Sequence, residues 1–320
     1  MTAEQRDLPQ LVVHADWSSD RKKRWMTVAA LESGVYRIEP PEPVGDVGSL
    51  IQGVRRRAGN RQVLLGFDFP IGVPEEYAKL AGISSFLAML IELGEGRWAR
   101  FYEIAESAAE ISLHRPFYPR RPGGTSQSHL VRGLGVAHMN DLLRRCDRSH
   151  GDRGPSCSLF WTLGGKQVGR AAITGWRDML APALQSDWSE IGVWPFQGDL
   201  PVLMRNRSCV VVETYPAQAC VQLGLAAPGR GWSKRNQRHR ASQHVRLMQW
   251  VAKMPVRLSP SLEAALQDGF GLLSDGEDRF DATVGLFALV EVVLGHRPEG
   301  APTDQTIRNV EGWTCGQIDE

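Results

Sequence analysis

The chain has 320 residues, which is enough for one large domain with insertions or for two domains that share an interface. Apolar residues make up 42% of the chain and charged residues 23%, as in folded soluble proteins. The net charge is +1, so no overall positive field draws the protein to nucleic acid. Any nucleic-acid binding must therefore come from local patches.

The cysteines and the apolar runs bear on where the protein resides. Five cysteines, with no Cys-x-x-Cys pair among them, argue against a disulfide framework or a zinc knuckle and favour a reducing compartment. The first ten residues are polar and carry no apolar signal core. The most apolar late run, Ala282 to Leu294, is too short to cross a bilayer and contains Glu291. We therefore expect a cytoplasmic protein without a membrane segment.

The beginning of the chain predicts an antiparallel meander followed by a buried strand. Apolar runs separated by polar turns predict three strands, at 11–15, 25–31 and 34–38. Residues 47–58 have helical spacing and end in basic residues, which suit a helix C-terminus. Residues 62–68 are almost continuously apolar, which is typical of a strand covered on both faces.

The middle of the chain is less regular, and we interpret residues 75–165 as an insertion or cap. This region contains a predicted helix at 84–93 and a segment rich in Pro, Arg and Gly at 115–124. Beyond it we predict strands at 191–196 and 209–214 and helices at 165–184, 234–254, 262–268 and 275–294. The whole order predicts one α/β domain, 1–320, with a mixed sheet flanked by helices.

Acidic residues end three of the predicted strands: Asp16, Asp68 and Glu213. In open α/β sheets, side chains at strand ends face the crevice in which ligands bind. Each of these acids, taken alone, is explained equally well as a cap for the turn that follows it.

Asp278 and Asp281 add a further segment. Their spacing of three places both carboxylates on one face near the start of the last predicted helix. The helix dipole alone accounts for Asp278, but Asp281 lies deeper in an apolar stretch. Carboxylates from separate segments suit Mg²⁺ or Mn²⁺, which can activate water and stabilise a leaving oxygen in phosphoryl transfer. We therefore predict Asp16, Asp68 and Asp281 as metal ligands, with Asp278 or Glu213 completing the site.

Two basic segments are candidates for contact with substrate phosphates. Lys234, Arg235 and Arg238 belong to the densest basic run of the chain. A solvated helix start explains that run equally well. Arg120 and Arg121 alternate with aromatic residues that could stack on bases, although a rigid surface loop is the simpler explanation.

Five short motifs carry a resemblance to a known family: His14-Ala-Asp-Trp-Ser18, Gly66-Phe-Asp-Phe-Pro-Ile-Gly-Val-Pro74, Val212-Glu-Thr-Tyr-Pro216, Ser233-Lys-Arg235 and Asp278-Arg-Phe-Asp-Ala282. In these motifs, and over most of its length except 75–160, the chain resembles the predicted RNase H-like nucleases of domain-of-unknown-function family 429. The resemblance implies an RNase H-like fold with a mixed five-stranded sheet, similar to RuvC-type resolvases. In that fold the first strand, the fourth strand and the last helix each supply an acid. By motif, these acids are Asp16, Asp68 and Asp281, with Asp278 as a helper and Glu213 in the family's own Glu-x-x-Pro motif.

The leading hypothesis is a metal-dependent nuclease or phosphodiesterase that acts on nucleic acid or another phosphorylated substrate. The first alternative is an ATP-dependent phosphotransferase like the sugar and acetate kinases of the same superfamily. Against it, no Gly-rich adenosine-binding segment lies near the last predicted helix. The second alternative is a non-catalytic binding protein that keeps the fold.

Overall fold

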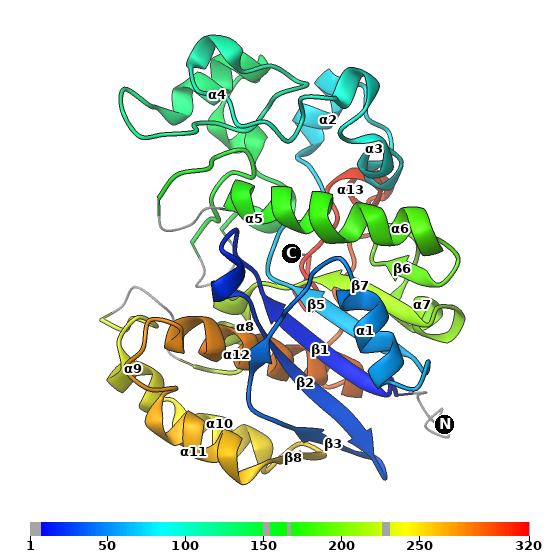
Figure 1. The fold of residues 1–320 in the computed structure, drawn as a ribbon, viewed down its shortest axis with the longest axis vertical. Helices are drawn as coiled ribbons and strands as arrows, with labels where there is room; N and C mark the ends of the chain where they lie inside the picture. The colour runs from blue at the N-terminus through cyan, green and yellow to red at the C-terminus, as the bar shows by residue number, and fades with distance from the viewer. Residues whose placement is uncertain (1–7, 150–153, 165–167, 226–230, 320) are drawn as a thin grey trace.

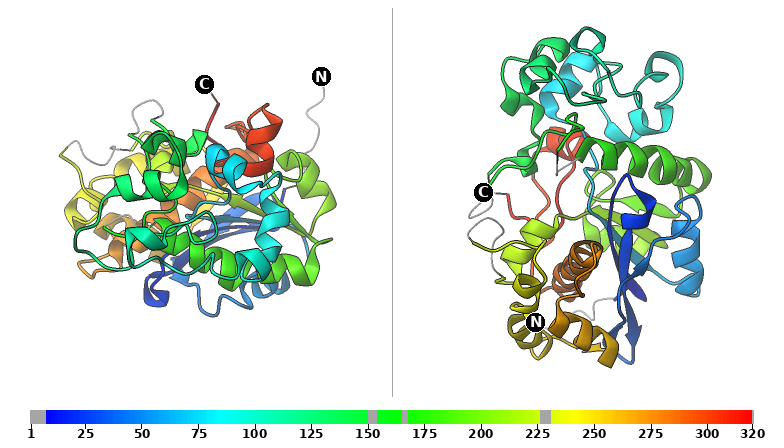
Figure 2. Two further views of the ribbon diagram at one scale, coloured as in Figure 1. Left: turned by 90° about the horizontal axis from the view of Figure 1, so that it is seen from above. Right: turned by 60° about the vertical axis from the view of Figure 1, so that its left-hand side comes forward.

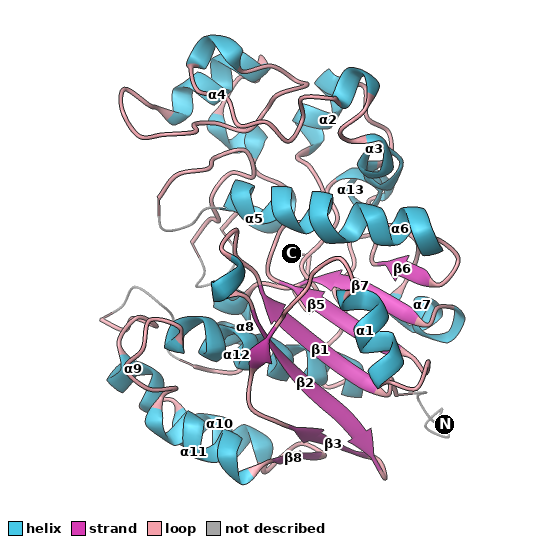
Figure 3. Ribbon diagram, viewed as in Figure 1, coloured by secondary structure: helices cyan, strands magenta, loops and turns pink. Residues whose placement is uncertain are grey.

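A mixed sheet of eight strands forms the centre of the molecule (Figures 1 and 3). The structure is a computed structural model, and it describes residues 8–149, 154–164, 168–225 and 231–319. The strands lie in the order β6-β7-β5-β1-β2-β3-β8, and β4 pairs with β2 outside this path. Their bounds are β1 Leu11–Asp16, β2 Trp25–Glu32, β3 Val35–Ile38, β4 Glu42–Pro43, β5 Val63–Phe67, β6 Ile191–Val193, β7 Cys209–Glu213 and β8 Val256–Leu258.

The predicted α/β class with a mixed sheet is confirmed, whereas the predicted count of five strands is wrong. Strands β1, β2 and β3 form the antiparallel meander, and β5, β7 and β6 continue the sheet in parallel from the other side of β1. Strands β4, β6 and β8 have only two or three residues each, and of these only β6 lies where a strand was predicted, at 191–196. Such short strands add little periodicity to the sequence.

Helices cover both faces of the sheet (Figure 2). Alternate residues of a strand point to opposite faces, so β1, β2, β5 and β7 each contribute to two separate apolar clusters. One cluster includes α1 and the continuous rod of α5 and α6, while the other includes α8, α10, α11 and the long helix α12. The bounds are α1 Leu50–Arg57, α5 Val168–Gly175, α6 Ala181–Asp187, α7 Leu200–Asn206, α8 Pro216–Gln222, α10 His244–Val251, α11 Pro260–Asp268 and α12 Gly276–Leu294.

The region that we predicted as an insertion lies beyond the α5–α6 rod (Figure 1). It contains α2 Glu75–Ala81, α3 Phe86–Glu92 and α4 Gln127–Leu134, and the later helix α13 Gln305–Val310 packs on α2 and α3. Its buried aromatic residues belong to the same apolar cluster as one face of the sheet. Among the described residues, therefore, this region shares a core with the rest of the chain.

Several predicted boundaries differ from the observed ones for local reasons. The strand predicted at 191–196 ends at Val193, because Pro195 lacks the N–H that a ladder needs. The helix predicted at 234–254 divides into α9 Gln237–Ala241 and α10. The helix predicted at 165–184 extends through α5 and α6 to Asp187, while its first three positions lie outside the described residues. Across the described ranges, no helix is both long and apolar enough to cross a membrane.

Candidate metal centre

Asp16 and Asp68 lie side by side where two neighbouring parallel strands end. Strand β1 ends at Asp16, and Asp68 directly follows β5. The backbone N–H of Asp68 donates a 3.1 Å hydrogen bond to the carbonyl of Ala15, which extends the parallel pairing by one residue. Because alternate residues share a face, Asp16 lies on the same side of β1 as Val12 and His14, which is the side covered by α12.

Helix α12 packs closely on this part of the sheet. The Nδ1 atom of His14 lies 3.0 Å from the carbonyl oxygen of Ala282 on α12. A Cβ atom at Gly285 would lie only 2.2 Å from the His14 ring, so glycine is needed for this close approach. The packing brings Asp281, one residue before Ala282, to the carboxylates at the ends of β1 and β5.

The three carboxylates share one cationic neighbour. The Nζ atom of Lys234 contacts Oδ2 of Asp281. The second oxygen of Asp281, Oδ1, is buried and has no hydrogen-bond partner, and the residue as a whole is 6% exposed. Within the described part of the chain, no side chain hydrogen-bonds to Asp16 or Asp68, of which the first is 8% exposed and the second half-buried.

Burial raises the pKa of all three aspartates, and the charge of a neighbouring carboxylate adds to the rise at each one. The pKa of Asp16 lies well above its usual value because the side chain is buried and because Asp281 and Asp68 are close. Burial and the charge of Asp281 raise the pKa of Asp68 to about 8. Burial also raises the pKa of Asp281, although the charge of Lys234 opposes this rise. A positive charge bound at this site would therefore stabilise the ionised aspartates.

Asp278 lies at the more open side of the group. It is half-buried and one helical turn before Asp281. Burial raises its pKa to about 6, with Lys23 opposing the rise and Asp281 adding to it. The Oδ2 atom of Asp278 also has no hydrogen-bond partner among the described residues. These features suit the helper role that we predicted for it.

Glu213 lies on the opposite face of the sheet from this group. It pairs with Phe67 across β7 and β5, and Phe67 belongs to the apolar cluster of the α1 side, as does Val211. Its two oxygens accept hydrogen bonds of 2.5 and 2.6 Å from the guanidinium of Arg144. The N–H of Ile71 donates a further bond of 2.6 Å to it. We predicted that Glu213 could complete the metal shell. In the structure, however, both of its oxygens already accept hydrogen bonds.

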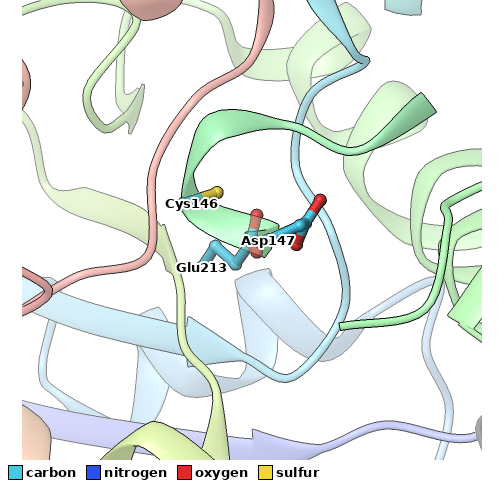
Figure 4. Close-up of side chains that lie close together, drawn as sticks. All are labelled: Cys146, Asp147 and Glu213. Carbon is cyan, nitrogen blue, oxygen red and sulfur yellow. The ribbon is translucent and has the colours of Figure 1, made fainter. Parts of the chain in front are cut away.

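Arg144 connects Glu213 to a second acid, Asp147. The guanidinium is fully buried, and it bonds Asp147 at 2.9 and 3.1 Å. Figure 4 shows Cys146, Asp147 and Glu213 gathered together, and ligand atoms of these three lie within 4.8 Å of one another. No other group of three such residues within the described ranges is so compact. Since Arg144 forms ion pairs with both carboxylates, we explain this cluster as a buried ion-pair network.

Of the predicted phosphate-binding residues, only Lys234 reaches the carboxylates. Arg235 is exposed and lies 3.7 Å from Glu277, and Arg238 is exposed as well. Arg120 and Arg121 are exposed on the loop at 115–124, where Arg120 forms a 2.6 Å ion pair with Glu106.

Two residues that we did not predict support the site. Arg240 is buried, and its guanidinium donates to the carbonyls of Gly269 and Gly271 at 2.8 Å and to that of Lys234. Thr214 follows Glu213 and therefore lies on the α12 side, with a buried hydroxyl that has no partner among the described residues. Each has one signal in the sequence: Arg240 ends the basic run, and Thr214 is part of the Glu-Thr-Tyr-Pro motif.

The donor set fits a hard divalent cation. Its oxygens come from carboxylates, which Mg²⁺ and Mn²⁺ prefer, and one of them is a buried oxygen without a partner. The oxygens of Asp16, Asp68 and Asp281 are less tightly grouped than those of the Arg144 network, as expected for like charges that repel one another.

Comparison with protein-family models, curated proteins and solved structures gave no match to the chain. The resemblance to the RNase H-like nucleases therefore stays a prediction. Any assignment of function depends on how the side chains are arranged.

Proposed function

We propose that this protein is a metal-dependent nuclease or phosphodiesterase with an RNase H-like fold. The observation that carries the proposal is the meeting of Asp16, Asp68 and Asp281, from three distant segments, with Asp281 offering a buried oxygen that has no partner. A buried group of like charges is costly unless something binds there. One divalent cation, Mg²⁺ or Mn²⁺, is the simplest ligand for it.

The order of the strands supports the RNase H-like part of the proposal. The resemblance implies acids from the first strand, the fourth strand and the last helix. Here Asp16 ends β1, and Asp68 follows β5, the fourth of the five longer strands. Asp281 lies on α12, the longest helix, which packs on β1 and β2. The alternation of buried residues turns Asp16 and Asp68 to the face of the sheet on which α12 packs.

Each side chain of the site has its own role in the proposed reaction. A bound divalent cation would activate water and stabilise negative charge on the phosphate. Asp16, Asp68 and Asp281 would hold it in place, and Asp278 at the open side would accept a hydrogen bond from solvent. Lys234 would attract the phosphate to the carboxylates, whose own charge repels it.

Nucleic acid is the substrate class that the surroundings favour. The exposed Arg235 and Arg238 follow Lys234 in the chain and can contact phosphates on either side of the one that is cleaved. Such contacts carry no sequence information, so we expect cleavage with little sequence preference and strong inhibition by salt.

A cleavage assay tests the proposal. Single- and double-stranded DNA and RNA are incubated with the protein in Mg²⁺, in Mn²⁺ and in EDTA. We expect metal-dependent cleavage of at least one substrate and a loss of about 100-fold or more in Asp16→Asn. Glu263→Gln, which removes an exposed acid of α11, is the matched control and should cleave like wild type. Absence of cleavage of every substrate in both metals would refute the nuclease assignment.

A further inference from the structure

We propose that the ammonium of Lys234 takes the place of one cation of a two-metal site. The centre then binds a single divalent cation instead of a pair. The inference rests on the proposed function, because it concerns the same carboxylates. It goes further by stating how many ions the site holds and which side chain takes the place of the second ion.

The first support is the position of the lysine ammonium. It contacts Asp281 directly, and the Lys234 side chain is only 18% exposed. Its charge also acts on Asp16 and on Asp68, so the ammonium lies within reach of all three carboxylates. In two-metal phosphodiesterases, cations about 3.5–4 Å apart are bridged by shared carboxylates. Here the ammonium takes up one oxygen of Asp281 and leaves the other, Oδ1, for a metal ion.

The second support is that the segment carrying Lys234 is held firmly. Trp232 donates a 2.8 Å hydrogen bond from its indole to the carbonyl of His239, and the Ser233 N–H bonds to the His239 ring at 3.0 Å. Arg240, itself buried, bonds to the Lys234 carbonyl. Lysine on a fixed backbone is a built part of the site, unlike a mobile surface lysine that finds an acid by chance.

The third support is the balance of charge. Three carboxylates and one ammonium leave a formal charge of −2 when all four groups are ionised. One divalent cation neutralises this charge. Two divalent cations beside the same four groups would leave an excess of +2, and burying uncompensated charge is costly. The ammonium therefore makes one divalent cation the number that balances these three carboxylates.

Metal stoichiometry tests this inference without relying on activity. Mn²⁺ is titrated into wild type, Lys234→Met and Lys234→Arg, with calorimetry and electron paramagnetic resonance as readouts. We expect one Mn²⁺ per chain in wild type and in Lys234→Arg, which keeps the positive charge. In Lys234→Met, both oxygens of Asp281 become free, and we expect a second Mn²⁺ with spin coupling between two ions about 3.5–4 Å apart.

Each outcome decides one of the two proposals. Two coupled ions in wild type, or a single ion in folded Lys234→Met, would overturn the inference while leaving the metal centre in place. Wild type that binds no Mn²⁺ would overturn the metal centre itself and the inference with it. The wild-type count does not depend on the variant, so a Lys234→Met chain that fails to fold still leaves the inference open to refutation.

Discussion

The backbone N–H of Asp68 donates a hydrogen bond to the carbonyl of Ala15, and this bond places two carboxylates next to each other at the ends of β1 and β5. Asp16, the neighbour of Ala15, then lies beside Asp68 on the face covered by α12. This local arrangement buries like charges together: burial and the charge of Asp281 raise the pKa of both aspartates, and Asp68 adds to the rise at Asp16. The site is thus costly for the fold unless a cation binds to it.

Because a charged Asp68 is costly for the fold when no cation is bound, we expect Asp68→Asn to stabilise the metal-free protein. The pKa of Asp68 is raised to about 8 in the fold, so its contribution to stability is complete below the unfolded pKa of 3.8 and is lost as pH rises towards 8. The variant has no such loss. Since Asp68 is half-buried, we expect a gain on the order of 1 kcal/mol, or roughly 2 °C in Tm, at pH 8 in EDTA. The gain should shrink at pH 5. Equal effects at both values would contradict this account.

When a divalent cation is present, wild type should become more stable than Asp68→Asn. Mn²⁺ at about 100 times its dissociation constant should stabilise wild type by about 2.7 kcal/mol, and Asp68→Asn should gain much less. The effect should be larger at pH 8 than at pH 6, because protons compete for the aspartates. Thermal melts with and without Mn²⁺ measure both quantities. Glu263→Gln should respond as wild type does, and a Tm of wild type that is insensitive to Mn²⁺ would count against the site.

Gly285→Ala should weaken both the fold and the site. A Cβ atom there would lie 2.2 Å from the His14 ring and push α12 from the sheet, at a cost of about 1–3 kcal/mol. Because Asp281 lies on the same helix, Mn²⁺ affinity should fall as well. Gly53→Ala in α1 is the matched control, since a Cβ at Gly53 meets nothing within 4 Å. We expect that control to be neutral or stabilising, and equal destabilisation in both variants would show that close packing at Gly285 is not the cause.

Arg144→Met should destabilise the protein more than any change among the three aspartates. It leaves Glu213 and Asp147 buried without their partner, which costs about 3–5 kcal/mol. Adding Glu213→Gln to Arg144→Met should recover part of this loss. Urea unfolding of wild type, both single variants and the double variant gives the interaction energy between the two residues. Additive effects would mean that the two side chains do not act as a pair.

The strand ends of the site could be predicted from the sequence, but the partners of each acid could not. Asp16 and Asp68 follow long apolar runs that identify β1 and β5 and so place both at one edge of the sheet. The alternation of side chains along β7 also predicts that Glu213 faces away from the aspartates, since Val211 and Glu213 share one face of that strand. Its ion pair was not readable, because Arg144 lies 69 residues away in an irregular segment without periodicity.

The basic run that contains Lys234 likewise shows that the sequence does not predict the partner of each side chain. Its density predicted phosphate contacts for Lys234, Arg235 and Arg238, but density alone does not say which side chains are buried. Helix α9 begins only at Gln237, so Lys234 and Arg235 lie in the turn before it. Within this stretch Arg240 is buried and Lys234 contacts Asp281, whereas Arg235 and Arg238 are exposed.

The most direct test of the metal centre is a crystal structure with Mn²⁺, measured at the manganese absorption edge. We predict one anomalous peak about 2.0–2.2 Å from carboxylate oxygens of Asp16, Asp68 and Asp281, with the ammonium of Lys234 beside it. A peak on Cys146, Asp147 and Glu213 instead, or no peak at any of these carboxylates, would contradict the assignment.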